Sequence, residues 1–299
     1  MTHQTLLTGN VLLCTNDPFV DAEGVRIAAD HGVLIEDARI VATGAADTLR
    51  DQSPHVQEYA YGNRLIIPGF VDSHAHYPQT AMIASWGKRL IDWLNTYTFP
   101  EEAKFGDCGY AGEVAGRYLD LVLANGTTTV ASYTTIHAGS VDAFFEAAAA
   151  RNMRVVAGKT CMDRNAPDDL RDSAQSAYDD SKALIGKWHG RGRAHYAITP
   201  RFSPTSTPDQ LAALGALWAE NPDCLMQTHL SEQHDEIAWV SELFPGARDY
   251  LDTYEAHGLL GPRGVYGHAI HLTPREIARV SEVGAALVHC PTSNTFIGS

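Results

Sequence analysis

Basic side chains are scarce in this chain, and their scarcity bears on the partners it can take. The 299 residues include 22 Lys and Arg against 36 Asp and Glu, which gives a formal net charge of -14. Such a charge repels the phosphates of nucleic acids and the anionic surface of a membrane. We therefore expect neither nucleic acid nor membrane as a partner, whereas a neutral small molecule remains open as a substrate.

Long apolar runs and paired cysteines are also missing. No run approaches the roughly 20 residues of a membrane-spanning helix. Residues 1–20 lack the basic start and apolar core of a secretory signal. The five cysteines are scattered, odd in number and never spaced C-x-x-C, which is typical of a reducing compartment and argues against a structural cysteine–zinc site. We expect a cytoplasmic protein.

Several motifs typical of nucleotide-binding sites and of hydrolytic enzymes are also absent or incomplete. Neither G-x-G-x-x-G nor G-x-S-x-G occurs. Gly158-Lys159-Thr160 resembles the end of a P-loop, but Met153 stands where that loop requires an earlier glycine. Cys290 precedes its proline, so the P-C-x-x-C signature of compact zinc deaminases is absent. Lys159 lies within a predicted strand, where we expect it to be buried with a partner.

From residue 65 onward the chain contains an alternation of apolar runs and helical patterns. Seven runs are typical of β-strands, namely Leu65–Val71, Thr127–Tyr133, Arg154–Cys161, Ala194–Thr199, Cys224–His229, Gly264–His268 and Ala285–Cys290. The helix candidates between them are Val141–Arg151, Leu170–Trp188, Pro208–Glu220, Asp235–Leu243 and Pro274–Glu282. Strand–helix alternation predicts a parallel sheet with right-handed crossovers, its strands covered on both faces.

The number of repeats indicates an incomplete barrel. Seven strands are one short of a (β/α)8 barrel, which takes about 250 residues, while 235 residues remain from residue 65 to the end. We therefore expect an α/β fold with a TIM-type barrel whose eighth strand and helix are missing from this sequence. The preceding segment differs: Leu6–Leu13 is one apolar run, and Val33–Ile35 followed by Ile40–Val41 predicts a tight hairpin.

Histidines follow or end three of the predicted strands. His74 and His76 come after the first run, and their i, i+2 spacing points both imidazoles to the same side of a β-strand. His229 and His268 end the fifth and sixth runs. Because the carboxyl ends of barrel strands meet at one rim, four imidazoles converge there. Imidazole nitrogens favour Zn²⁺ or Fe²⁺ over Mg²⁺ or Ca²⁺, so we expect one such ion per chain.

Glu232 follows His229 by three residues and lies just past the predicted strand. There a carboxylate can lean over a bound metal without ligating it, which is the position of a general acid or base. The alternative is a helix N-terminal carboxylate, favoured by the dipole of the helix Asp235–Leu243. The proximity of His229 favours the catalytic role.

These residues occur in the order found in the metal-dependent amidohydrolase superfamily, which the chain resembles from about Leu65 to its C-terminus. A more specific resemblance is to the guanine deaminases. The segments that carry it are Pro78-Gln79-Thr80, Asp92–Glu101, Thr199–Pro204, His229–Glu232 and His289–Asn294. The T-Y-T-F-P-E and T-P-R-F stretches within them are far more specific than the shared metal motif.

The resemblance implies zinc-dependent hydrolytic deamination of guanine to xanthine and ammonia, with Glu232 as proton shuttle and His268 as a second catalytic residue. The metal ligands that it implies are His74, His76, His229 and His268. The substrate contacts that it implies are Gln79, Arg201, Phe202, His229 and Glu232. Arg201 presents fixed donors to a purine carbonyl, and Phe202 offers an apolar face to a flat base. Without the family, a surface arginine, a core phenylalanine and a solvated glutamine would be the simpler interpretations.

The resemblance also implies a domain organisation and leaves alternatives open. Residues 1–64 correspond to the N-terminal half of a small β-sandwich domain, and residues 65–299 to a barrel truncated after strand seven. The family takes an aspartate from the end of strand eight, which this sequence does not reach. We expect the full-length protein to be a homodimer. We also expect either that this sequence is part of a longer gene product or that it is an inactive fragment. The alternatives are an aminohydrolase or chlorohydrolase acting on another heterocycle, and a non-catalytic metal-binding fragment.

Overall fold

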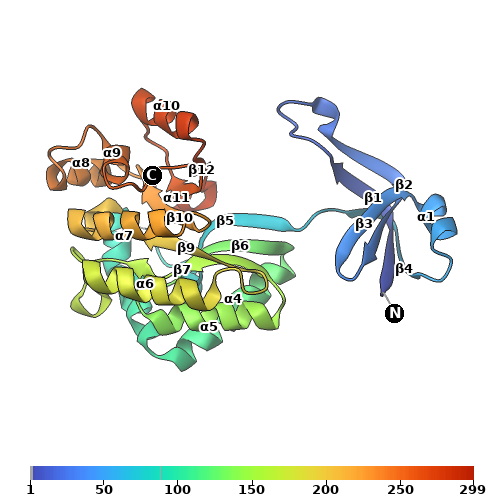
Figure 1. Cartoon of the computed structure of the whole chain (residues 1–299), viewed down its shortest axis with the longest axis horizontal. Coiled ribbons are helices and arrows are strands. Elements are labelled where there is room, and N and C mark those ends of the chain that lie inside the picture. The colour runs from blue at the N-terminus through green and yellow to red at the C-terminus, as the bar shows by residue number, and fades with distance from the viewer. Residues whose placement is uncertain (1–2, 88) are drawn as a thin grey trace. The chain divides into compact units, whose positions relative to one another are not determined.

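The computed structural model describes residues 3–87 and 89–299, which divide into two units. The units are Met1–Gly69 and Phe70–Ser299, and Figure 1 shows the chain coloured from one terminus to the other. Among the helices of the described residues, none combines the length and apolar character needed to span a lipid bilayer.

The first unit is a four-stranded sheet with one short helix, α1 (Ala46–Gln52). Its strands are β1 (Gln4–Cys14), β2 (Val25–Glu36), β3 (Arg39–Ala45) and β4 (Gln57–Ile66), in the order β3-β2-β1-β4. The predicted hairpin joins β2 to β3 through Asp37 and Ala38, whose φ angles of 47° and 63° suit the twist of a two-residue turn. A second packed sheet, which would complete a sandwich, does not occur among the described residues.

The second unit is a nearly closed barrel of seven parallel strands, which confirms the predicted fold class. The strands follow the order β12-β11-β10-β9-β7-β6-β5, with the short β8 (Thr160–Cys161) beside β9. Their bounds are β5 (Phe70–His76), β6 (Thr127–Tyr133), β7 (Arg154–Gly158), β9 (Ala194–Pro200), β10 (Leu225–Leu230), β11 (Gly264–His268) and β12 (Ala286–Val288). β5 and β12 are the two ends of this path.

Helices connect successive strands and cover the outside of this sheet (Figure 1). The longer ones are α4 (Cys108–Ala124), α5 (Ala138–Ala150), α6 (Ala174–Trp188), α7 (Pro208–Glu220), α8 (His234–Leu243) and α10 (Pro274–Val283). Val155, Ile198 and Met226 from neighbouring strands are buried in one apolar core with Phe144 and Leu214 from these helices. Burial on both faces explains why the strands are continuous apolar runs.

Local signals set where the helices begin. The predicted helix over Leu170–Trp188 starts later, at Ala174, because Ser173 caps it: its hydroxyl accepts from the backbone N–H of Ser176. Leu170 lies instead in a short 3-10 turn, Asp168–Leu170. None of the predicted helices covers residues 77–124, where the structure has α4 and a run of short helical segments.

The strand predicted over Leu65–Val71 is divided in the structure. Leu65 and Ile66 pair with β1 as the end of β4. The barrel strand β5 begins at Phe70 and continues through His76. Pro68 and Gly69 lie between them, and proline has no backbone N–H to donate to a ladder. The prediction was therefore wrong about one continuous strand.

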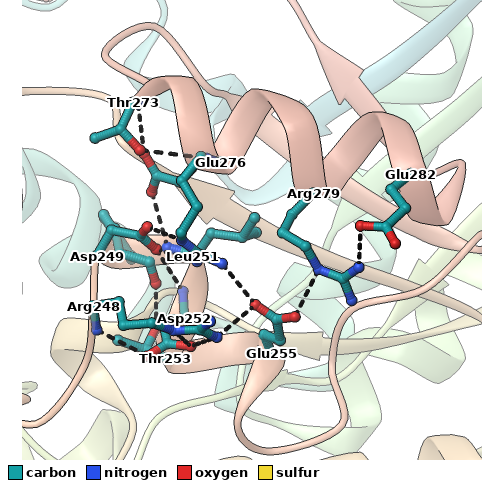
Figure 2. A network of polar contacts seen from close by, with 12 residues as sticks. Arg248, Asp249, Leu251, Asp252, Thr253, Glu255, Thr273, Glu276, Arg279 and Glu282 are labelled. Atoms are coloured by element: carbon teal, nitrogen blue, oxygen red, sulfur yellow. Dashed lines mark hydrogen bonds and ion pairs between the residues drawn. The ribbon is translucent and has the colours of Figure 1, made fainter.

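Ion pairs fasten α9 (Tyr250–Glu255) to α10 (Figure 2). The Arg279 Nε donates to Glu255 at 2.8 Å, and Arg275 donates to Glu255 at 3.0 Å and to Asp249 at 2.6 Å. Arg248, which precedes α9, pairs with Asp252 in that helix. These ion pairs therefore hold α9, in the segment after β10, against α10, in the segment after β11.

Candidate metal centre and substrate pocket

Three strand ends bring four imidazoles together. His74 and His76 come from β5, His229 from β10 and His268 from β11. The His74 ring lies 5.3 Å from His76, 4.8 Å from His229 and 4.9 Å from His268, measured between ring centroids. The ligand nitrogens of His74, His76 and His229 all lie within 4.8 Å of one another, a spacing that can hold a metal ion. The parallel register of the barrel produces this convergence, as predicted.

Hydrogen bonds orient these rings for metal binding. The Nδ1 of His229 lies 2.7 Å from the carbonyl oxygen of Arg201, so Nδ1 carries the proton and Nε2 keeps its lone pair. That Nε2 faces the Nε2 of His76 at 3.1 Å. Among the described residues, the buried His74 Nε2 and His76 Nδ1 have no hydrogen-bond partner. Several imidazole nitrogens facing one another without donors fit a shared cation.

Burial keeps the imidazoles in the neutral form that ligates metals. It lowers the pKa of His74 to about 3, with a further contribution from His268, and the pKa of His268 to about 4. The pKa values of His76 and His229 are also well below the ordinary value, first because of burial and then because of the neighbouring histidines. Lone pairs are therefore available at neutral pH.

The backbone around the cluster is unusual. A Cβ atom added to Gly267 would lie 2.4 Å from the His74 ring. β11 can therefore pass this close to His74 because Gly267 has no side chain. Ser231, His268 and Ala269 have φ angles of 48°, 68° and 49°. Positive φ at residues other than glycine costs free energy and is concentrated at functional sites.

Glu232 lies over the histidine cluster, as its place after β10 predicts. Its Oε2 is 3.3 Å from the Nε2 of His268, and the residue is 2% exposed. Burial raises the pKa of Glu232 well above its ordinary value, and the neighbouring Glu236 raises it further. A raised pKa makes this carboxylate a stronger base, which suits a group that accepts a proton and passes it to an adjacent group.

One cavity of about 590 Å³ contains all the residues predicted for the site. His74, His76, Gln79, Arg201, Phe202, His229, Glu232 and His268 line it. Gln79 comes from the 3-10 segment Tyr77–Met82, and Arg201 and Phe202 follow β9. Phe202 is 3% exposed and lies within an apolar cluster that includes Phe99 and Ile297. Arg201 is buried and is therefore not a surface arginine, Gln79 is half-buried, and Phe202 has the burial of a core phenylalanine while it also lines the cavity.

Sequence reasoning missed some residues of the site. Cys290 also lines the pocket, and Asn294 contacts the Nδ1 of His268 at 3.0 Å. Both lie in the segment His289–Asn294 that carried the family resemblance, which was the available signal. His289 itself is exposed and does not line the pocket. No aspartate lines it in the part of the chain that the structure describes.

Comparison with known proteins supports the resemblance. The chain is 45% identical to the guanine deaminase of Escherichia coli over 285 residues, covering 95% of this chain and 65% of that protein. A probable guanine deaminase of Deinococcus radiodurans is 39% identical, again with 65% of its length covered. The chain therefore spans just under two thirds of the length of these curated relatives.

Solved structures give the same result. The crystal structure of guanine deaminase from Bradyrhizobium japonicum matches with a TM-score of 0.97 at 39% identity, covering 99% of this chain and 65% of that one. Guanine deaminase from C. acetobutylicum, solved with bound guanine in its active site, matches with a TM-score of 0.93 at 32% identity, covering 99% and 70%. A triazine hydrolase at 24% identity and a TM-score of 0.85 shares the fold, with 99% of this chain and 67% of that one covered.

The family assignment rests on the barrel itself. The model of the Amidohydrolase family matches residues 65–299, which include every strand from β5 to β12. The match thus includes all four histidines and Glu232. This chain belongs to the amidohydrolase family.

Proposed function

We propose that this protein hydrolyses guanine to xanthine and ammonia. The observation that carries the proposal is a single pocket lined both by the histidine cluster with Glu232 and by Gln79, Arg201 and Phe202. The first group supplies the means to activate water, and the second suits a flat, carbonyl-bearing base. The 45% identity to a guanine deaminase supports the same substrate.

We propose one zinc ion per chain, with iron as the alternative, held by His74, His76, His229 and His268. The clustered nitrogens of His74, His76 and His229, and the unpartnered Nε2 of His74 and Nδ1 of His76, fit a borderline-soft divalent ion. Such an ion supplies Lewis-acid activation of water when it is bound. The carbonyl of Arg201 fixes the tautomer of His229, which leaves Nε2 free to bind it.

Glu232 moves the proton in the proposed reaction. Its buried carboxyl group lies beside His268 and faces the same cavity as the histidine cluster. It can take a proton from the attacking water and deliver it to the departing amine, so that ammonia leaves as a neutral molecule. Burial, which raises the pKa of Glu232, suits a group that must hold a proton during the reaction.

The remaining residues recognise the base. The Arg201 guanidinium presents N–H donors to the 6-oxo group of guanine, and adenine offers an amino group at that position instead. Gln79 both donates and accepts, which matches the amide-like edge of the ring. Phe202 contributes an apolar wall. These are the contacts that distinguish guanine from other heterocycles.

The test is the release of ammonia from guanine and adenine, and of chloride from a chlorinated triazine, by metal-loaded protein. We expect guanine to be the preferred substrate. Preference for another ring would favour the alternative aminohydrolase or chlorohydrolase. Metal binding without turnover of any ring would favour a non-catalytic metal-binding chain.

The metal site has its own test, which does not depend on turnover. We expect elemental analysis to find about one zinc or iron per purified chain, and His229→Ala and His268→Ala to lose most of it. His289→Ala is the matched control, because His289 is exposed and outside the pocket. Unchanged metal content in both site variants would reject the assignment.

We further propose a homodimer in the cytoplasm as the working form. The scattered cysteines and the family resemblance support this proposal. Light scattering coupled to size-exclusion chromatography measures the mass, and a monomer at micromolar concentration would contradict the dimer.

A further inference from the structure

A buried ion pair lies directly behind the substrate pocket. The Arg201 Nη1 and Nη2 atoms lie 2.5 and 3.0 Å from the two carboxylate oxygens of Glu102, a bidentate contact. The Glu102 side chain is 0% exposed and that of Arg201 is 3% exposed. Glu102 ends α3 (Phe99–Glu102), while Arg201 follows β9, 99 residues later. Arg201 lines the pocket and Glu102 does not.

Two side chains, Glu102 and Phe99, hold the Arg201 guanidinium in place. The Phe99 ring lies 5.4 Å from the Arg201 Cζ, measured to the ring centroid, so an aromatic face and a carboxylate both position the guanidinium. Guanidinium has five N–H donors, and the bidentate contact uses two of them. The Arg201 carbonyl also orients His229. Glu102 therefore acts on a residue that touches both the pocket and the metal cluster.

The pair also sets the charge of this part of the pocket. An isolated buried guanidinium attracts any anion, whereas a guanidinium neutralised by a carboxylate keeps its donors and loses its net charge. A neutral ring carbonyl then becomes a better ligand than an anionic ring. Stability alone does not explain the pair, because apolar residues often replace buried ion pairs without loss of stability.

We propose that Glu102 is a positioning residue that neutralises and orients Arg201, so that the pocket selects neutral oxo-purines and rejects the same rings as anions. The proposal rests on the proposed function and deepens it by naming the charge state of the substrate. The class of substrate is thus the uncharged base. An anionic oxo-purine carries the same carbonyl but brings an uncompensated charge into the pocket.

The test compares two purines that both carry a 6-oxo group. Guanine is neutral near neutral pH, and urate is a monoanion. Calorimetry is run on zinc-loaded protein carrying Glu232→Gln, in which the proposed hydrolysis of guanine is slowed, so that binding is measured. With Glu102 unchanged, it should show tighter binding of guanine than of urate. In Glu102→Gln, guanine binding should weaken by about tenfold, since a charge-assisted contact that orients Arg201 is lost. Urate binding should strengthen, because Arg201 is no longer neutralised.

Glu101→Gln is the matched control. Glu101 precedes Glu102 on the same short helix and pairs with Lys104 at 2.6 Å and with Tyr110, not with Arg201. This variant should keep the wild-type preference for guanine. A general loss of structure would weaken the binding of both purines together. The proposal requires instead that guanine binding weakens while urate binding strengthens.

A second measurement does not depend on any purine. Inorganic sulfate should raise the melting temperature of Glu102→Gln more than that of wild type, because the unpaired guanidinium takes up an anion. The double variant Glu102→Gln with Arg201→Met should lose this sulfate effect, since both charges are gone. If Glu102→Gln keeps the wild-type purine preference, or gains nothing from sulfate, the proposal is wrong. If wild type binds no guanine, the proposed function fails, and the sulfate measurement alone decides the role of Glu102.

Discussion

At the scale of single residues, the site is prepared by contacts that precede any ligand. The Nδ1–H of His229 donates a hydrogen bond to the backbone carbonyl of Arg201, and its Nε2 faces His76. Glu232 loses its solvation and so favours its protonated form. Both effects come from burial at the carboxyl ends of strands, where the barrel removes water and supplies backbone acceptors.

The acid–base role of Glu232 gives the first prediction. Glutamine keeps the shape of Glu232 but cannot accept a proton. In a chain that includes the eighth barrel strand, we expect Glu232→Gln to keep its zinc and to deaminate guanine about 10²–10⁴-fold more slowly. Turnover and metal content are measured on the same preparation. Near-normal turnover would assign the proton transfer to another group.

Gly267 gives a second prediction at this scale. A methyl group there would lie 2.4 Å from the His74 ring, which must then move away from the cluster. We expect Gly267→Ala to weaken zinc binding by about 10–100-fold, the usual effect of disturbing the support of a metal ligand. Gly186→Ala is the control, because nothing lies within 4 Å of its added Cβ in α6. Equal zinc affinity in the two variants would contradict this account.

At the scale of elements, the connections after the strands are fastened to one another. The network between α9 and α10 holds two of these connections together (Figure 2). Asp252 is a carboxylate of α9 that accepts from the backbone N–H of Arg248 at 2.8 Å and from its Nε at 2.9 Å. Partly buried charge pairs of this kind contribute more than exposed ones.

Asp252 carries the third prediction, which includes a pH dependence. Hydrogen bonds from the Arg248 side chain are the main reason that the pKa of Asp252 is lowered in the folded protein. A lowered folded pKa means that the stabilisation is complete above the unfolded value of about 3.9 and is lost as pH falls through the folded value. We expect Asp252→Asn to reduce the free energy of unfolding by about 2 kcal/mol near neutral pH.

Denaturant titrations at several pH values measure this difference. It should shrink as the solution becomes more acidic than the unfolded pKa. Glu282→Gln is the control, because the Glu282 side chain is 69% exposed and pairs with Arg279. That variant should change the free energy of unfolding by less than about 0.5 kcal/mol. A pH-independent loss in Asp252→Asn would mean that packing, not charge, explains the effect.

At the scale of the whole molecule, the barrel formed by the described residues has two edge strands, β5 and β12, and we call the gap between them the seam. β5 and β12 end the strand order and are not paired with each other. Phe70 and Val71 on β5 are 56% and 64% exposed, and Leu287 on β12 is 42% exposed. Apolar strand edges with free backbone groups pair readily with other chains.

The seam gives the last prediction. We expect the 299-residue chain to aggregate on standing, and Val71→Lys to slow this aggregation without changing the metal content, because a charge on an edge strand opposes pairing. Light scattering over time measures the rate. Ile27→Lys, a similarly exposed residue of β2 in the first unit, is the control. Equal protection by both variants would point to net charge and not to the seam.

The sequence by itself determined the class of fold and the strand ends that carry chemistry. Apolar periodicity is a local property, so the alternation of strands and helices and the positions of His229 and His268 could be read directly. A break within an apolar run is harder to predict. Pro68 and Gly69 divide one such run between two units. The capping of α6 by Ser173, which delays that helix, was also underestimated.

Only the tertiary structure decided which side chains meet. Glu102 and Arg201 are 99 residues apart, and nothing in either local pattern pairs them. Gly267 matters because β11 passes close to His74, a distance that depends on the register of two strands far apart in the chain. The His229 proton is fixed by a carbonyl 28 residues earlier. Contacts of this kind arise from closing the sheet, since barrel curvature, and not sequence spacing, brings these atoms within bonding distance.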